Sequence, residues 1–191
     1  MTKALVIVDV QNDFCPGGSL ATERGDVVAE SIAQLLATNS GDYDHIVATQ
    51  DWHIDPGTHF SNTPDFVDTW PVHCVADSEG AAMRALLAKE SAAAVIEEYF
   101  RKGRYEAAYS GFEGASTSDE DVLLAQWLNE RGVTHIDVVG IATDHCVRAT
   151  ALDGLREGFN VRVLREHCSP VSEERGLAAL EELREAGATV I

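Results

Sequence analysis

The sequence predicts an α/β fold: a three-layer α/β/α, doubly wound domain spanning residues 1–191, with a mostly parallel six-stranded sheet. Short apolar runs typical of strands alternate along the chain with segments whose apolar residues recur at helical spacing. A length of 191 residues and a hydrophobic share of 45% suffice to bury one sheet on both faces. No internal repeat, low-complexity tract or linker divides the chain.

Six segments are predicted as strands. The first, residues 3–10, is a near-continuous apolar run interrupted only by Asp9, as expected of a strand buried on both faces. The third has the least distinct pattern, and its Val95-Ile96 and Tyr99-Phe100 pairs favour a strand. The five strands after the first are predicted over residues 45–49, 93–100, 133–141, 160–164 and 189–191.

Five segments are predicted as helices, each between two consecutive strands. Ser118 is expected to cap the third helix, because acidic residues fill the first turn that follows it. The predicted helices cover residues 26–37, 79–89, 119–131, 144–157 and 172–186. The segment 50–78 has no sustained periodicity, and loops of this length in compact domains are usually functional.

Right-handed crossovers leave few topologies for such a chain, and a common one has the strand order 3-2-1-4-5-6. In that order the ligand crevice lies between strands 1 and 4. The carboxyl ends of these strands carry Asp9 and the turn 143–146. Residues far apart in the sequence are therefore expected to meet at one edge of the sheet.

The charge of the chain argues against two classes of partner. A formal net charge of -18 repels both nucleic acid and anionic membranes. No run approaches the roughly 18 apolar residues of a membrane span, and the N-terminus does not resemble a signal peptide. We therefore expect a cytoplasmic protein with reduced thiols. The four cysteines form no C-x-x-C pair, which leaves a zinc ribbon unsupported.

Cys146 is the candidate nucleophile. The strand that precedes Cys146 breaks at Gly140. The chain then restarts as a helix, with Cys146 in its first turn. The positive end of the helix dipole favours a thiolate there, at the place where open α/β sheets bind ligands. The alternative interpretation is a small buried hydrophobic residue, since free cysteine is often buried.

A nucleophilic thiol needs a base and often a cation. Asp9 is the preferred base, because His145 adjoins Cys146 on a helix and such neighbours diverge by about 100°. A basic group after the third predicted strand could supply the cation: Arg101, Lys102 and Arg104. A cysteine phosphatase loop is excluded because it needs arginine at the position of Leu152. The dinucleotide-binding fingerprint is excluded as well, because the residues from Gly140 to Ala142 do not form G-x-G.

The loop 50–78 carries four residues of the types that ligate metals: Asp51, His53, His59 and His73. Imidazole with carboxylate suits zinc, iron or manganese. In an extended segment Asp51 and His53 point the same way, and the Pro56-Gly57 turn can return His59 toward them. The alternative is that these histidines decorate a surface loop.

Together these motifs resemble the nicotinamidases (pyrazinamidases) of the isochorismatase-like cysteine hydrolase superfamily, over nearly the whole chain. The resemblance rests on five stretches: residues 9–14 (DVQNDF), 50–59 (QDWH with PG and H), 70–74 (WPVHC), 102–112 (KG with YSGF) and 140–147 (GIATDHCV).

The resemblance implies a role for each matched position. It implies a catalytic triad of Asp9, Lys102 and Cys146, and one divalent metal ion held by Asp51, His53, His59 and His73. It implies that Phe14 and Trp70 sandwich a flat ring and that Tyr109 lines the pocket. It also implies a cis peptide before Ala142, and an oxyanion hole formed by the backbone N–H groups of Ala142 and Cys146.

The implied reaction is the hydrolysis of a small aromatic amide, nicotinamide and with it pyrazinamide, through a cysteine thioester in NAD salvage. Three alternatives stay open. Another small amide of the superfamily could be the substrate, the metal could activate water with Cys146 a bystander, or the chain could be a non-catalytic metal- or ligand-binding module. The sequence leaves the oligomeric state undefined.

Overall fold

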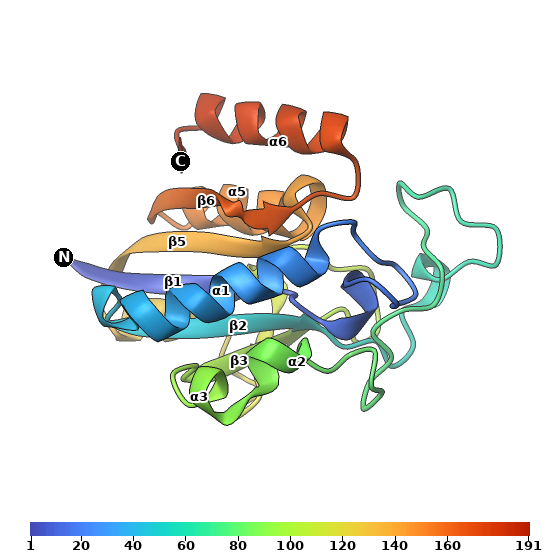
Figure 1. Ribbon diagram of the computed structural model, residues 1–191, viewed down its shortest axis with the longest axis horizontal. Coiled ribbons are helices and arrows are strands. Elements are labelled where there is room, and N and C mark those ends of the chain that lie inside the picture. The colour runs from blue at the N-terminus through green and yellow to red at the C-terminus, as the bar shows by residue number, and fades with distance from the viewer.

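Seven strands form one sheet at the centre of the molecule in the computed structural model, which describes residues 1–191. Helices cover both faces of the sheet, and the long loop after β2 projects beyond one end of it (Figure 1). The strands are β1 (Thr2–Val8), β2 (His45–Asp51), β3 (Glu98–Lys102), β4 (Ala115–Ser116), β5 (Val133–Ile141), β6 (Asn160–Ser169) and β7 (Thr189–Val190).

The strand order is β4-β3-β2-β1-β5-β6-β7. Its six parallel strands reproduce the predicted order 3-2-1-4-5-6, so the doubly wound fold is confirmed. The seventh strand was not predicted: β4 is two residues long and pairs antiparallel with β3 at the edge. The Glu98 carboxylate fixes this edge, because it accepts hydrogen bonds from the Thr117 backbone N–H (3.2 Å) and hydroxyl (2.7 Å).

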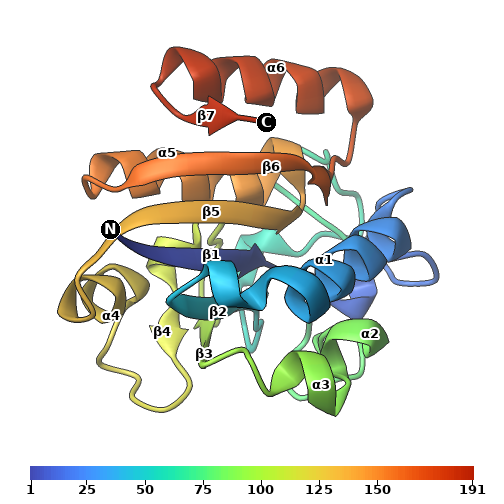
Figure 2. The same cartoon turned by 60° about the vertical axis from the view of Figure 1, so that its left-hand side comes forward.

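The helices divide between the two faces (Figure 2). They are α1 (Gly25–Asn39), α2 (Ala85–Ala88), α3 (Glu90–Ala93), α4 (Leu124–Glu130), α5 (Arg148–Arg156) and α6 (Glu173–Glu185). Alternate residues of β1 face opposite sides: Leu5 and Ile7 pack with α1, α2 and α3, while Ala4 and Val6 pack with α4, α5 and α6. None of the helices has the length and apolar character that crossing a membrane requires.

The predicted helix over residues 79–89 is wrong in its first half. Residues 80–84 instead run beside the exit of β1, where Met83 pairs antiparallel with Gln11. Asn12 N donates to Ala82 O at 3.0 Å, and Arg84 N donates to Val10 O at 2.8 Å. Because these backbone groups bond to β1's exit, helix begins only at α2. The third strand, predicted over residues 93–100, is displaced as well: α3 ends at Ala93, a turn follows, and β3 begins at Glu98.

Three other boundaries differ from the prediction. Ser118 caps no helix, because its N–H and that of Asp119 donate to the Ser116 hydroxyl, and α4 begins six residues later. The strand β6 continues five residues past the predicted end. The helix that carries Cys146 opens with a wide turn, Thr143–Val147, in which Val147 N donates to Ala142 O at 3.0 Å. Regular α-helix starts only at α5.

Gly140 is expected to be essential to the meeting of β1 and β5. Its φ is +121°, and a Cβ there would lie 2.1 Å from Val8 O. We expect Gly140→Ala to lower the free energy of unfolding by more than about 2 kcal/mol in urea titrations. Gly41→Ala is the control, because a Cβ at Gly41 meets nothing within 4 Å. Equal stability of the two variants would contradict this account of Gly140.

Candidate active site

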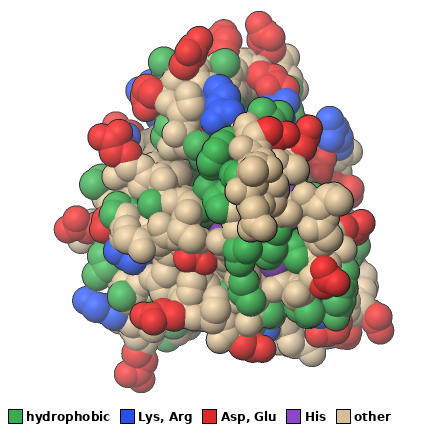
Figure 3. Space-filling model, turned by 90° about the vertical axis from the view of Figure 1, so that its right-hand side faces the viewer, with side chains coloured by type: hydrophobic (Ala, Val, Ile, Leu, Met, Phe, Trp, Pro, Cys, Tyr) green, Lys and Arg blue, Asp and Glu red, His purple; other side chains and the backbone are tan.

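The carboxyl ends of four neighbouring strands bring the candidate residues together. Asp9 follows β1, Asp51 and Lys102 end β2 and β3, and the Cys146 turn follows β5. Figure 3 views the molecule from this end: hydrophobic side chains gather in the middle of the face, histidine lies recessed among them, and acidic side chains occupy the periphery. The predicted meeting of Asp9 with Cys146 is therefore observed.

Lys102 is the centre of a buried charge cluster. Its Nζ lies 2.8 Å from Asp9 Oδ2 and 3.6 Å from Cys146 Sγ, and it also pairs with Asp51 Oδ1. Side-chain oxygens of both aspartates and the Cys146 sulfur lie within 4.8 Å of one another. Of the three basic residues that the sequence offered, Lys102 reaches the thiol; the Arg101 guanidinium instead stacks on Trp52, 3.5 Å from the ring centre.

The protonation states follow from burial and from this pairing. Burial raises the pKa of Asp9, although Lys102 opposes the rise. Burial also lowers the pKa of Lys102, but Asp51 and Asp9 outweigh it and hold that pKa well above its ordinary value. The ammonium is thus charged beside a carboxyl group with raised proton affinity, which suits Asp9 to accept a proton.

The expected stabilisation of a thiolate by the helix dipole is wrong for this structure. Burial raises the pKa of the Cys146 thiol well above its ordinary value, and the nearby charge of Lys102 only partly offsets that rise. The wide turn that opens the helix also departs from a regular helix N-terminus. Cys146 is therefore a thiol at rest, and a nucleophilic role would require a base to take its proton.

Backbone conformation aims Asp9 into the site. Asp9 has a φ of +47°, in the left-handed region that few non-glycine residues adopt. Its N–H donates to Thr49 O at 3.2 Å, and its Oδ1 accepts from the Thr49 hydroxyl at 2.6 Å. The neighbouring strand β2 thus fixes both the backbone and the side chain of Asp9.

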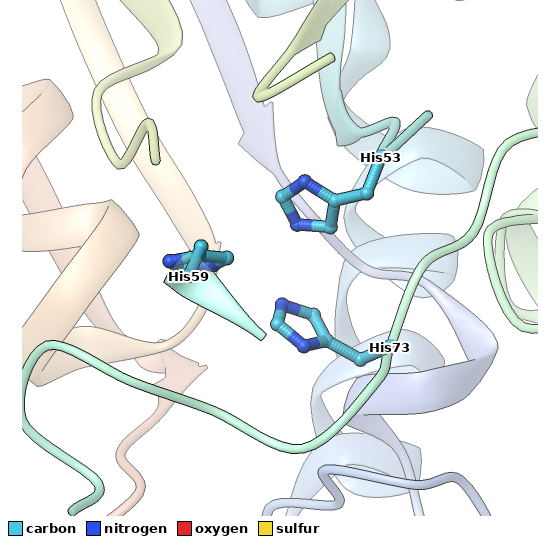
Figure 4. Close-up of side chains that lie close together, drawn as sticks. All are labelled: His53, His59 and His73. Carbon is cyan, nitrogen blue, oxygen red and sulfur yellow. The ribbon is translucent and has the colours of Figure 1, made fainter. Parts of the chain in front are cut away.

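Three imidazoles from the loop after β2 point toward one another (Figure 4). One ring nitrogen from each of His53, His59 and His73 lies within 4.8 Å of the others. His53 Nδ1 lies 2.6 Å from Gly103 O, and His73 Nδ1 lies 2.7 Å from Pro71 O. A carbonyl oxygen only accepts, so both Nδ1 atoms carry hydrogen, which leaves Nε2 as the ring nitrogen that can offer a lone pair.

These residues fit a metal ion. His53 Nε2 and His59 Nδ1 are buried without a hydrogen-bond partner, which is costly unless something binds there. Burial lowers the pKa of His59 to about 4, so its ring is neutral at physiological pH. Asp51 Oδ2 lies 3.7 Å from His53 Nε2 and 3.8 Å from His73 Nε2. Three imidazoles, two of them oriented by backbone carbonyls, form together with a carboxylate a typical donor set for a divalent cation.

Gly103 shapes this histidine cluster from behind. Its φ is +72°, and a Cβ there would lie 2.7 Å from His53 Cε1. The residue after Lys102 must therefore lack a side chain for the His53 ring to reach the Gly103 carbonyl. One turn thus serves both the ammonium and a histidine.

A pocket opens beside Cys146, His59 and His73, with about 400 Å³ of space not filled by atoms, part of which is open solvent. Trp70 and Tyr109 form one wall, where Trp70 Nε1 donates to Tyr109 Oη at 3.0 Å. Phe14 lies on the histidine side, its ring centre 5.6 Å from that of His73. The pocket is lined by Phe14, Leu20, Asp51, His59, Trp70, His73, Ala108, Tyr109, Ala142, His145, Cys146 and Val171.

The peptide bond between Ile141 and Ala142 is cis, as the resemblance implied. Ala142 and Cys146, the two residues that the resemblance assigns to an oxyanion hole, both line the pocket.

Several lining residues escaped the sequence reasoning. His145 was considered only as a base, yet its ring packs edge-on against Trp70 with 5.0 Å between ring centres. His145 and Cys146, which are adjacent in the chain, both line the pocket. Leu20, Ala108 and Val171 come from three separate segments, and no local pattern marks them.

Comparison with known proteins identifies the family. The profile of the isochorismatase domain matches residues 3–191. The chain belongs to the isochorismatase family. Among its relatives in that family is the nicotinamidase/pyrazinamidase of Mycobacterium tuberculosis, which is 50% identical over 189 residues, or 99% of this chain and 98% of the relative.

Solved structures agree with this family membership. The pyrazinamidase of Pyrococcus horikoshii, in complex with zinc, has a TM-score of 0.83 and 34% identity, covering 100% of this chain and 99% of that one. PnC1 of L. infantum, in complex with nicotinate, has a TM-score of 0.84 and 32% identity, covering 100% and 92%. The isochorismatase-like fold therefore extends over the whole chain.

Removing the Lys102 charge should destabilise the fold, because Asp9 and Asp51 would lose their buried counter-charge. We expect Lys102→Met to lower the free energy of unfolding of metal-free protein by about 3–5 kcal/mol near neutral pH, measured by urea titration. Without the ammonium both carboxyl groups have raised pKa values, so protonation relieves the loss. The difference from wild type should therefore shrink as the pH falls toward about 5.

Lys3→Met is the matched control. Lys3 also pairs with a buried aspartate, Asp137, at 2.9 Å, but Arg162 remains beside that carboxylate. We expect a loss below about 1 kcal/mol. A loss for Lys102→Met that equals the control and does not change with pH would show that the cluster contributes no such charge balance.

Proposed function

We propose that this protein is a nicotinamidase that hydrolyses nicotinamide, and with it pyrazinamide, to the carboxylic acid and ammonia. The observation that carries the proposal is Lys102 placed between Asp9 and Cys146, with Cys146 lining an aromatic pocket that His59 and His73 also line. The 50% identity to a nicotinamidase/pyrazinamidase over nearly the full length of both chains supports it. So does the similarity to a structure that holds nicotinate.

The aromatic wall suits a flat, neutral ring. Phe14 and Trp70 would enclose the pyridine ring, and the hydrogen bond from Trp70 to Tyr109 fixes the indole before the substrate arrives. Pre-formed walls reduce the entropy that binding must remove. A divalent metal ion, zinc, iron or manganese, held by Asp51, His53, His59 and His73 would supply a Lewis acid for the ring nitrogen, directly or through water.

In the first half of the reaction, Cys146 Sγ attacks the carboxamide carbon and forms the carbon–sulfur bond. Asp9 takes the thiol proton, for which its raised pKa suits it. The oxygen that becomes negative would be held by the N–H groups of Ala142 and Cys146. As the carbon–nitrogen bond breaks, Asp9 returns the proton to the leaving amide nitrogen, which departs as ammonia.

In the second half, water attacks the thioester carbon while Asp9 takes a proton from it. The carbon–sulfur bond breaks, and the proton restores the Cys146 thiol. Lys102 stays charged throughout, which balances the negative charge that moves between Asp9 and the sulfur. The product is the carboxylic acid of the substrate ring, which releases its own proton to solvent at neutral pH.

We also propose that this reaction serves NAD salvage in the cytoplasm. Four buried cysteines without disulfide bonds agree with a reducing compartment.

Replacing the nucleophile tests the mechanism. We expect Cys146→Ala to lower kcat for ammonia release from nicotinamide by at least about a thousandfold, since no thioester can form. The variant should still bind zinc, because Cys146 contributes nothing to the histidine cluster. Activity near that of wild type would instead favour direct attack by metal-activated water, with Cys146 a bystander. A fully folded wild type that releases ammonia from no small amide would favour a non-catalytic binding module.

Removing single ligands tests the metal site. We expect His53→Ala and His73→Ala to lose most bound metal in elemental analysis after gel filtration, with a large loss of nicotinamide hydrolysis. His167→Ala is the control, because His167 lies outside the site and contacts Ser31. Unchanged metal content in both ligand variants would remove the proposed site.

A further inference from the structure

We propose that Gln11 and Asp13 are positioning residues that hold the first and last ligands of the metal site, Asp51 and His73, in place. The inference rests on the proposed function in one respect, that the histidine cluster binds a metal ion. Both side chains belong to the segment by which the chain leaves β1. Neither lines the pocket nor belongs to the donor set.

Gln11 grips the backbone of Asp51 on both sides. Its Oε1 accepts from Asp51 N at 2.9 Å, and its Nε2 donates to Asp51 O at 2.8 Å. The same Nε2 donates to Ala81 O, also at 2.8 Å. The side chain is 0% exposed, so water cannot replace these bonds. Both N–H donors and the oxygen of the Gln11 carboxamide are therefore in use, and together these bonds fix the position of the Asp51 backbone.

Asp13 fixes the other end of the segment 51–73, which carries the four proposed metal ligands and is called the metal loop below. Its Oδ2 accepts from Cys74 N at 2.7 Å, directly after His73, and its Oδ1 accepts from Ser19 N at 3.3 Å. Cys74 has a φ of +45°, an uncommon conformation that this hydrogen bond holds. The direction in which the His73 side chain points depends on that turn.

The chain also leaves room for the Asp13 carboxylate. A Cβ at Gly80 would lie 2.1 Å from Asp13 Oδ2, so only glycine allows the approach. Asp13 N donates to Gly80 O at 3.0 Å. Side chain and backbone of Asp13 thus fasten two parts of one loop to β1. Phe14 follows Asp13 directly and its ring packs near that of His73, so Asp13 fixes the chain on both sides of this contact.

The test is the dissociation constant for zinc of metal-free protein, measured by competition with a chromophoric chelator. Loss of a partner that orients a metal ligand typically weakens metal affinity ten- to a hundredfold. We expect an increase in Kd of about that size for Gln11→Met and for Asp13→Ala. Gly80→Ala reaches the same end by displacing the carboxylate from Cys74. At saturating zinc, kcat should recover to within about threefold of wild type.

Asn12→Ala is the matched control from the same segment. Asn12 Nδ2 donates to Glu79 O at 2.8 Å, so the variant loses an anchoring bond that touches no ligand. We expect its zinc Kd to stay within about twofold of wild type. Asp13→Asn keeps an oxygen for the Cys74 amide and should also remain close to wild type.

The outcomes separate the inference from the proposed function. Wild-type zinc affinity in Asp13→Ala, Gly80→Ala and Gln11→Met, with a loss of thermal stability like that of Asn12→Ala, would reduce both residues to fold stabilisers and overturn the inference. Should Asp13→Ala not fold, the other two variants decide. A wild type that binds zinc without hydrolysing nicotinamide would defeat the proposed function and leave the Kd comparison valid. A wild type that binds no zinc would overturn both the metal site and its positioning.

Discussion

The site depends on one buried ammonium group held by two carboxylates. Removing Lys102 from water is costly, and the structure offsets that cost with Asp9 on one side and Asp51 on the other. Each carboxylate then has a second task. Asp9 faces the Cys146 thiol, and Asp51 faces the imidazoles of the metal loop. A single cation thus fixes the separation between the candidate nucleophile and the candidate metal site.

The parallel sheet makes this arrangement possible. Parallel strands end on one edge, so Asp9, Asp51 and Lys102 reach neighbouring positions from segments about fifty residues apart. The loop after β2 has little regular structure of its own and takes its shape from its neighbours. The exit of β1 holds it through Gln11 and Asp13, and the turn after β3 holds it through Gly103.

The charge state at rest suits a neutral substrate. Burial keeps the Cys146 thiol protonated, and His59 is neutral because burial lowers its pKa. In the proposed mechanism, reactive charge therefore arises only when Asp9 takes the thiol proton. A flat amide that brings no charge must be recognised by ring walls and by its own nitrogen lone pair. The Trp70–Tyr109 wall and the histidine cluster lie on the pocket that would offer both.

Features that depend on residues close together in the chain can be predicted from the sequence, whereas features that depend on distant residues cannot. The order of the parallel strands follows from alternation and crossover handedness, and short motifs place Asp9, Cys146 and the histidines. The helix over 79–89 was predicted from the local sequence, but its first half does not form, because backbone groups of Ala82 and Arg84 bond to Asn12 and Val10, about seventy residues away. The thiol was predicted as a thiolate from its local helix, but burial by the whole fold sets its pKa. The roles of Gln11 and Gly103 could not be predicted either, because each interaction uses a backbone group, which carries no residue identity in a sequence: Gln11 binds the backbone of Asp51, and Gly103 offers its own carbonyl to His53.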